Sequence, residues 1–306
     1  MRLSFAGTPP FAATILGGLQ ASEHEVGLVI SQPDARRGRG RRVTQTAVAE
    51  LARAQGLPLR QPERISEVAD EISAYDALIV AAYGQILRPD TLYAARHGAW
   101  NVHASLLPAY RGAAPIERAI MAGEQTSGVT IIRMDEGLDT GPMALRRSTE
   151  ISPDMTGGEL TESLARLGSE AIVESMSSLE RGTLTLIEQD SLKATYAARL
   201  SGEDRFIRWG LKVLEVHDLV RALAPHIGAR AVHPDYGAPI KILRARVHDQ
   251  SARSLEIGEI DAANRRILVG CGVGVLQILE LQAPGGKRLP AMDFLRGKKL
   301  EGCFAV

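Results

Sequence analysis

The stretch Trp100-Asn-Val-His-Ala-Ser-Leu-Leu-Pro-Ala-Tyr-Arg-Gly112 joins a strand-forming segment to a loop that contains proline. Side chains two residues apart on a strand point to the same face of a sheet. We therefore expect Asn101 and His103 to face one small target, such as the oxygen of a reacting carbonyl. The pattern predicts a polar site at the end of a buried strand.

The sequence on both sides of this strand alternates short apolar runs with helical patterns. This alternation is typical of an α/β protein with a Rossmann-like, doubly wound and mostly parallel sheet. The predicted strands are Leu3–Ala6, Val26–Ser31, Ala77–Ala82, Trp100–Ala104 and Val129–Met134. The predicted helices are Phe11–Gln20, Thr46–Gln55, Ile116–Ala122 and Gly157–Leu179. Since ligands bind beyond the carboxyl ends of strands in such sheets, the loop after His103 is where a site is expected.

The pattern changes from about Thr195 onward. A helix is predicted at Lys212–Leu223, followed by strands at Ile240–Val247, Ile267–Val269 and Val275–Leu281. This order is typical of a small, OB-like β-barrel. We therefore expect a catalytic domain at 1–188, a linker at 189–204 and a C-terminal β-barrel domain at 205–306.

The composition is that of a globular protein, with 306 residues of which 45% are hydrophobic and 24% are charged. No run approaches the roughly 18 apolar residues of a membrane span, and the start is too rich in glycine and proline for a secretory signal. Two cysteines provide no disulfide framework. We expect a cytoplasmic enzyme with no membrane partner, and a monomer, because nothing in the sequence predicts an obligate oligomer.

The net charge of zero conceals an asymmetry. Thr195–Val306 carries 17 Lys and Arg against 12 Asp and Glu, which leaves 19 against 24 of the 36 and 36 in total for the preceding residues. Within that acidic part lies Arg36-Arg-Gly-Arg-Gly-Arg-Arg42, with five arginines in seven residues. Guanidinium groups beside flexible glycines predict phosphate contacts, although a solvated surface loop also explains the charge.

A second polar segment, Asp135-Glu-Gly-Leu-Asp-Thr-Gly141, follows the predicted strand Val129–Met134. Asp139 in this segment is placed to orient the His103 ring and to favour its protonated form. An imidazolium and an amide N–H aimed at one point form an oxyanion site. We therefore predict acyl transfer without a covalent enzyme intermediate.

Several other site types are disfavoured by the spacing of the residues. Ser105 lacks the G-x-S-x-G turn of a serine nucleophile, and we expect it to make a hydrogen bond within its loop. Neither calcium-loop nor zinc spacing is met, so we expect a site without metal. Gly7 alone follows the first strand, which disfavours a nicotinamide or flavin cofactor.

These residues together resemble the methionyl-tRNA formyltransferases, a family within the formyl-folate-dependent transferases. The likeness covers nearly the whole chain and includes Phe5-Ala-Gly-Thr-Pro9, Gly38-Arg-Gly40, Ala81-Ala-Tyr-Gly84, Asn101–Gly112, Asp135–Gly141 and Thr195-Tyr-Ala197. It implies transfer of a formyl group from 10-formyltetrahydrofolate to the α-amino group of initiator methionyl-tRNA, by direct attack of the amine and through an oxyanion.

The resemblance also implies roles for individual residues. The catalytic residues would be Asn101, His103 and Asp139. Folate would be bound by Ser105, Leu106, Leu107, Pro108, Tyr83, Gly84, Ile86 and Leu87. The tRNA would be contacted by Arg36, Arg37, Arg39, Arg41 and Arg42, and also by the β-barrel. Either His103 or a water relayed by Asp139 would pass a proton to the departing folate nitrogen.

Three other functions remain as alternatives. A formyltransferase acting on an amino-sugar nucleotide shares the Asn-x-His and Ser-Leu-Leu-Pro patterns. A folate-dependent hydrolase would leave the basic C-terminal part without a role. A non-catalytic RNA-binding protein would leave the polar residues Asn101, His103 and Asp139 without one.

Overall fold

A computed structural model describes residues 1–37, 42–251 and 254–306. The chain divides into two compact units. The first unit comprises Met1–Pro115, Thr126–Thr149 and Thr161–Ala197, and the second comprises Ile116–Gln125, Glu150–Leu160 and Ala198–Val306.

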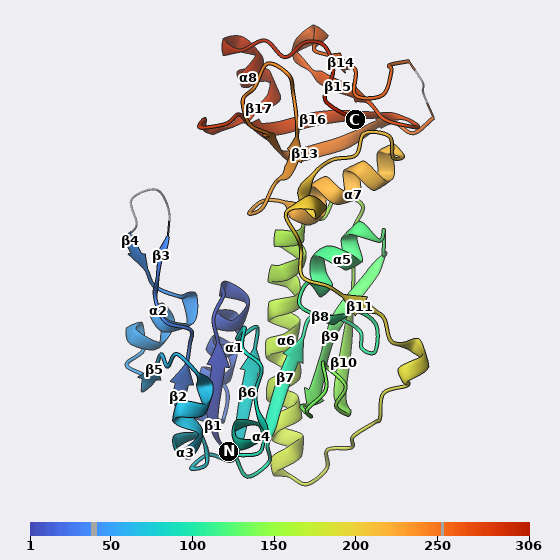
Figure 1. Ribbon diagram of the computed structural model, residues 1–306. Coiled ribbons are helices and arrows are strands. Elements are labelled where there is room, and N and C mark those ends of the chain that lie inside the picture. The colour runs from blue at the N-terminus through green and yellow to red at the C-terminus, as the bar shows by residue number, and fades with distance from the viewer. Residues whose placement is uncertain (38–41, 252–253) are drawn as a thin grey trace. The chain divides into compact units, whose positions relative to one another are not determined.

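The first unit is built on a seven-stranded sheet with the strand order β10-β9-β7-β6-β1-β2-β5 (Figure 1). Its strands are β1 (Arg2–Gly7), β2 (Glu25–Ile30), β5 (Leu59–Arg60), β6 (Ala77–Ala81), β7 (Ala99–His103), β9 (Thr126–Arg133) and β10 (Met143–Glu150). Five of them, β1, β2, β5, β6 and β7, pair in parallel, whereas β9 runs antiparallel to β7. The prediction of a Rossmann-like, mostly parallel sheet is confirmed.

α-Helices begin between these strands or directly after the last of them. They are α1 (Pro10–Gln20), α2 (Ala47–Ala54), α3 (Ala69–Ile72), α4 (Pro89–Leu92), α5 (Pro115–Met121) and α6 (Gly157–Glu180), with the short 3₁₀ helix η1 at Ile65–Val68. Local sequence signals explain where the first two of these helices start. Helix α1 starts at Pro10, whose missing N–H costs nothing at the first helical position. Helix α2 is capped by the Thr46 hydroxyl, which accepts a hydrogen bond from the N–H of Ala49.

Helix α6 determines which face of β7 is left for a site. Its Gly168 approaches β7 so closely that a Cβ there would lie 2.7 Å from Cγ1 of Val102. Val102 lies between Asn101 and His103, so its side chain points to the opposite face of the sheet. The helix therefore covers one face, and the polar pair is on the other.

The second unit holds an antiparallel sheet with the order β12-β13-β16-β15-β14, and β17 also pairs with β16. Its elements are α7 (Val213–Leu223), β12 (Ala229–Ala231), β13 (Ile240–Asp249), β14 (Ile260–Asp261), β15 (Ile267–Gly270), β16 (Val275–Gln282), β17 (Arg288–Pro290) and α8 (Ala291–Gly297), with 3₁₀ helices η3 (Glu203–Arg205) and η4 (Ala263–Arg265). Its core includes the stacked rings of Trp209 and Phe304, whose centroids are 5.2 Å apart. The predicted C-terminal β domain is confirmed as an antiparallel sheet.

Two small sheets were not expected from the sequence. Strand β8 (Arg111–Gly112) pairs in parallel with β11 (Tyr196–Ala197), which follows the 3₁₀ helix η2 (Ser191–Lys193). Strands β3 (Ala35–Arg37) and β4 (Arg42–Thr44) pair antiparallel on either side of the residues that are not described. Among the helices in the described ranges, none is both long and apolar enough to cross a membrane.

Candidate functional site

The polar pair on β7 lies at the carboxyl end of the parallel strands. Strand β7 pairs with β6 in the register Val80↔Asn101, so the loops that follow both strands leave the sheet at the same edge. His103 is 5% exposed, whereas Asn101 is half-buried. The site is therefore formed where the sheet geometry predicts it.

Asp139 lies beside both Asn101 and His103, and its carboxylate accepts hydrogen bonds from residues of β7 and β8. Asn101 Nδ2 donates to Asp139 Oδ1 at 3.3 Å, and His103 Nδ1 lies 3.6 Å from the same oxygen. The other oxygen, Oδ2, accepts the backbone N–H of Gly112 at 2.9 Å. The structure thus places all three predicted catalytic side chains in one cluster, with the loop after β7 bound to the same carboxylate.

Asp139 reaches this position from the far end of β7. Because β9 is antiparallel to β7, with Arg133 opposite Trp100, the loop after β9 starts near the amino end of β7. The loop folds back through a left-handed φ of +54° at Asp139. Asp135 stabilises this turn, since its Oδ1 accepts the Thr140 hydroxyl at 2.6 Å.

The His103 ring lies between two acceptors. Its Nε2 is 2.9 Å from the carbonyl oxygen of Tyr110, and its Nδ1 faces Asp139. A neutral imidazole has one N–H, while the imidazolium has two and can donate to both acceptors. Nε2 therefore has an acceptor at hydrogen-bond distance, whereas Asp139 is close enough to Nδ1 for a charge interaction but not for a hydrogen bond.

Residues of the segment expected to be a linker hold the site loops in place. Gln189 Nε2 donates to the carbonyl oxygens of Asp139 and Gly141, both at 2.8 Å, and its Oε1 accepts from the buried Arg111 guanidinium. Thr195 accepts the N–H of Tyr110 through its hydroxyl, at 2.8 Å. Sequence reasoning did not assign these roles. The only signal for them was the family pattern that contains Thr195.

The Ser105–Pro108 loop, expected to contact folate, is divided between buried and accessible side chains. Ser105 and Leu107 are buried, and the Ser105 hydroxyl donates to the carbonyl of Ala109 at 2.6 Å, as predicted for a loop hydrogen bond. Leu106 and Pro108 are partly exposed. Leu106 and Pro108 are therefore the two side chains of this loop that a ligand can reach, and the other two shape the loop.

The loop after β6 shows the same division. Tyr83 and Leu87 are buried, whereas Gly84 and Ile86 are exposed, Ile86 to 91%. Gly84 has a φ of +92°, and a Cβ placed on it would meet no atom within 4 Å. Burial raises the pKa of the Tyr83 phenol to about 12, so the hydroxyl remains a donor, yet it has no hydrogen-bond partner among the described residues. The buried side chains of Tyr83 and Leu87 therefore shape this loop, and Gly84 and Ile86 are the residues that a ligand can reach.

The arginine loop is only partly described. Arg39 and Arg41 lie outside the described residues, and Arg36, Arg37 and Arg42 are described only as backbone in β3 and β4. Their role in contacting tRNA therefore stays a prediction.

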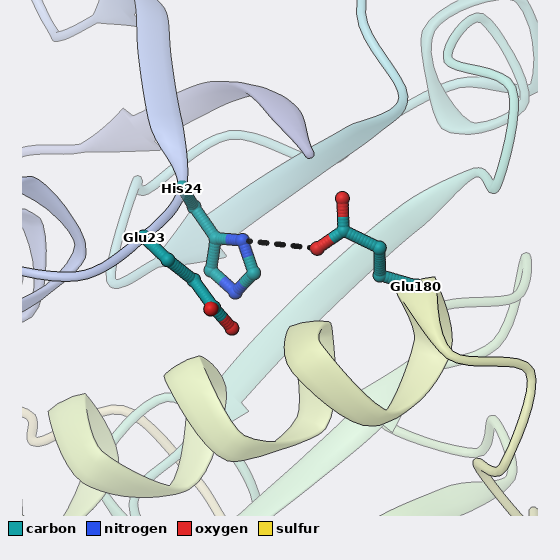
Figure 2. A group of neighbouring side chains, drawn as sticks. All are labelled: Glu23, His24 and Glu180. Atoms are coloured by element: carbon teal, nitrogen blue, oxygen red, sulfur yellow. Dashed lines mark ion pairs between the residues drawn. The ribbon is translucent and has the colours of Figure 1, made fainter.

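One group of three side chains in the described ranges has the composition of a metal site. It consists of Glu23, His24 and Glu180, whose ligand atoms lie within 4.8 Å of one another (Figure 2). His24 Nδ1 is 3.8 Å from Glu180, and Glu23 accepts a hydrogen bond from the hydroxyl of Ser177 at 2.6 Å. Since none of these residues belongs to the Asp139 cluster, the group does not test the expectation of a reaction without metal.

Comparison with known proteins gives the same assignment as the sequence patterns. Residues 1–176 match the family described as formyl transferase, and residues 199–299 match the formyl transferase C-terminal domain. A methionyl-tRNA formyltransferase of Rubrobacter xylanophilus is 65% identical over 304 residues, which cover 99% of both chains. One of Herminiimonas arsenicoxydans is 41% identical over 98% of both chains.

Solved structures with lower identity share the fold. An N-formyltransferase of Helicobacter canadensis, in complex with folinic acid and dTDP-3-aminofucose, has a TM-score of 0.67 at 17% identity, over 90% of this chain and 98% of that one. HypX of Aquifex aeolicus, in complex with tetrahydrofolic acid, has a TM-score of 0.69 at 17% identity, over 99% of this chain and 50% of that one. The resemblance inferred from the motifs is confirmed: the chain belongs to the formyl transferase family and, within it, to the methionyl-tRNA formyltransferases.

Proposed function

We propose that this protein transfers a formyl group from 10-formyltetrahydrofolate to the α-amino group of initiator methionyl-tRNA, for the initiation of translation. The observation that carries the proposal is the convergence of Asn101, His103 and Asp139 at the end of β7. The 65% identity to a methionyl-tRNA formyltransferase over the whole length supports the choice of donor and acceptor.

In this proposal the neutral α-amine attacks the formyl carbon, a C–N bond to the acceptor forms, and the bond from the formyl carbon to the folate nitrogen breaks. An α-amine with a pKa near 8 is partly neutral at physiological pH. One N–H of Asn101 is used by Asp139, which leaves the second for the oxyanion. No residue of the chain is required as a nucleophile.

His103 supplies positive charge to the same oxyanion, with Asp139 as its counter-ion. Its Nε2–H is directed at the Tyr110 carbonyl, so a direct hydrogen bond to the oxyanion requires that carbonyl to turn away. Tyr110 has a left-handed φ of +60°, a conformation that costs a non-glycine residue free energy. The proton released by the amine returns to the folate nitrogen through His103 or through a water held by Asp139.

The donor would lie against the loops after β6 and β7. Leu106, Pro108, Gly84 and Ile86 would contact it, and the Tyr83 hydroxyl would donate to it. Ser105, Leu107 and Leu87 would shape the walls behind them. The acceptor tRNA would be bound by Arg36, Arg37, Arg39, Arg41 and Arg42 together with the second unit.

We extend the proposal to the organisation of the protein. Residues 1–188 would form the catalytic domain, 189–204 the connecting segment and 205–306 the tRNA-binding domain, in a cytoplasmic monomer that acts without metal. The connecting segment would also hold the site loops through Gln189 and Thr195.

A transfer assay with two acceptors tests this function. Labelled formyl group should move from 10-formyltetrahydrofolate to charged initiator tRNA and not to an amino-sugar nucleotide. Asn101→Ala should lower the rate about 10²–10³-fold, the usual effect of losing one oxyanion donor. His97→Ala is the matched control, because His97 precedes the same strand without belonging to the cluster. Transfer to the sugar nucleotide alone would overturn the proposal.

A further inference from the structure

A cavity of about 230 Å³ lies in the second unit, between the residues before α6, helix α7 and strand β13. All the residues that line it belong to this unit. The volume is below the range of about 300–1,000 Å³ that drug-sized ligands occupy, so the cavity suits a small group.

The cavity is lined by a buried histidine with an unused nitrogen. His217 on α7 is 4% exposed, and its Nε2 has no hydrogen-bond partner among the described residues. The backbone of Ala245 on β13 is a hydrogen-bond acceptor for the ring. Asp154 Oδ1 lies 3.4 Å from Nε2 without forming a hydrogen bond. A buried polar atom without a partner is rare and points to a ligand.

Three arginines line the same cavity as His217. Arg244 and Arg246 on β13 line the cavity and are exposed. Arg246 uses its Nε on Gln277 at 2.9 Å, which leaves its terminal nitrogens for a ligand. Arg221 on α7 also lines the cavity, but its charge is already paired with Asp218 at 2.7 Å.

The amino end of α6 adds to the positive electrostatic potential in the cavity. Thr156 lines the cavity and forms a capping box with Glu159, whose Oε2 accepts the N–H and the hydroxyl of Thr156 at 2.8 Å. The amino end of this 24-residue helix carries a partial positive charge that favours an anion. Glu159 and Asp154 oppose it, but Asp154 is 78% exposed and can turn into solvent.

We propose that this cavity binds one phosphate group, held by Arg244 and Arg246, with Nε2 of His217 donating to it when the ring is protonated and Asp154 turns into solvent. A phosphate accepts from guanidinium forks and from an imidazolium N–H, and residues with both kinds of group line this cavity. The group can belong to an RNA backbone or to a small phosphorylated molecule. The first source rests on the proposed function, whereas the site itself does not depend on it.

Direct titration of the full chain tests the site without folate or tRNA. Calorimetry with inorganic phosphate and with sulfate should give saturable binding. Arg244→Gln and Arg246→Gln should each weaken it about tenfold, because each removes a charge-assisted hydrogen bond. Asp154→Asn should strengthen binding by removing the opposing carboxylate. Arg266→Gln is the matched control, an exposed arginine that does not line the cavity.

The pH dependence tests the part played by His217. Asp154, Asp218 and Arg221 are the charged groups that act on its ring, and burial lowers its pKa. Sulfate keeps its charge over this range, so tighter sulfate binding on going from about pH 7 to about pH 5 would report protonation of Nε2. The His217→Gln variant should lose this pH dependence. Since Arg244 and Arg246 are exposed, their variants test the site even if His217→Gln fails to fold.

Binding of uncharged tRNA separates the two sources of phosphate. If the group belongs to RNA, Arg244→Gln should weaken tRNA binding and reduce its salt dependence by about one unit of slope. If it belongs to a small molecule, tRNA binding should stay unchanged while sulfate binding is lost. The proposal is overturned if neither anion binds saturably, or if both arginine variants bind the anions like the unchanged protein.

Discussion

His103 and His217 are both nearly fully buried and each lies beside an aspartate, but their other contacts differ. His103 has Nε2 on the Tyr110 carbonyl and Nδ1 facing Asp139, whose side chain is only 13% exposed. His217 has no hydrogen-bond partner for Nε2 among the described residues, and its neighbour Asp154 is 78% exposed. Burial and a carboxylate neighbour do not by themselves define a role for histidine. What differs is that Nε2 of His103 has a hydrogen-bond acceptor at 2.9 Å and that Asp139 is itself held by Gly112, whereas Nε2 of His217 has no such acceptor in the described part of the chain and Asp154 is exposed.

The contacts that hold His103 and its aspartate come from three separate segments. The segment after β7 provides Tyr110, which contacts the ring, and Gly112, which binds Asp139; the loop after β9 provides Asp139 itself, and the connecting segment provides Gln189, which also binds Asp139. At His217 the ring is fixed on one side only, by the backbone of β13. The first arrangement suits a group that must hold its charge through a reaction, and the second suits a group that waits for a ligand.

The largest effect is expected from removing the charge of Asp139. Asp139→Asn keeps the shape of the side chain but deprives His103 of its counter-ion, so the formyl transfer rate should fall about 10²–10³-fold. Steady-state transfer at saturating donor and acceptor measures this. Glu136→Gln, an exposed change in the same loop, is the control and should leave the rate unchanged. A near-normal rate for Asp139→Asn would remove the proposed difference between the two histidines.

A smaller but still large effect is expected at Gly112. Its φ is +117°, and a Cβ there would lie 2.8 Å from the carbonyl oxygen of Ala197. Gly112→Ala should displace the N–H that binds Asp139 and lower the turnover by up to about 10²-fold, the effect of a misplacement near 1 Å. Gly182→Ala separates strain from contact, because Gly182 also has a positive φ but no atom within 4 Å of the added Cβ. Equal losses in both variants would argue against a specific role for Gly112.

The sequence predicted the part of this arrangement that depends on local periodicity. The alternation in β7 puts Asn101 and His103 on one face, and the order of strands and helices predicts the parallel sheet that exposes their end. These inferences rest on the extended conformation of the five residues of β7 and on the order of the strands and helices on either side of it.

The rest depends on pairing that no local pattern encodes. Asp139 reaches His103 because β9 is antiparallel to β7. The position of an aspartate after a predicted strand does not show whether that strand runs parallel or antiparallel to its neighbour. Gln189 lies in a stretch without regular hydrophobic spacing, so its contact with the site loops arises only in the folded chain. His217 lies in α7, a helix that the amphipathic pattern of the sequence predicts. A single histidine in such a helix is usually interpreted as a core residue.

About a tenfold effect is expected at Gln189. Gln189→Leu removes the two hydrogen bonds that tie Asp139 and Gly141 to the connecting segment, each worth about 1 kcal/mol, and it also removes the acceptor of the buried Arg111 guanidinium. The rate should fall while the affinity for tRNA stays the same. Gln55→Leu, at the exposed end of α2, should have no effect. Unchanged turnover in Gln189→Leu would show that the connecting segment does not support the site.

The smallest effect concerns the stability of the second unit. Burial lowers the pKa of His217 in the folded protein below the ordinary value of 6.5. Because the unfolded chain then binds the proton more readily, stability is fully present above about pH 6.5 and is lost as the pH falls below it. Urea unfolding across this range should show the loss, and His217→Gln should reduce it. His226→Gln, an exposed histidine change, should leave the loss as it is.

The loop after β7 has a further consequence through Thr130. The Thr130 hydroxyl donates to the carbonyl of Ser105 at 2.7 Å and accepts the N–H of Leu107 at 3.0 Å, so one side chain of β9 fastens both ends of a three-residue span. The conformational entropy of that span is lost when the protein folds and not when a ligand arrives. A formyl donor that contacts this loop would meet a surface that already has the shape of the bound state. The residence time of the formyl donor would then depend on the contacts it makes and not on ordering of the loop.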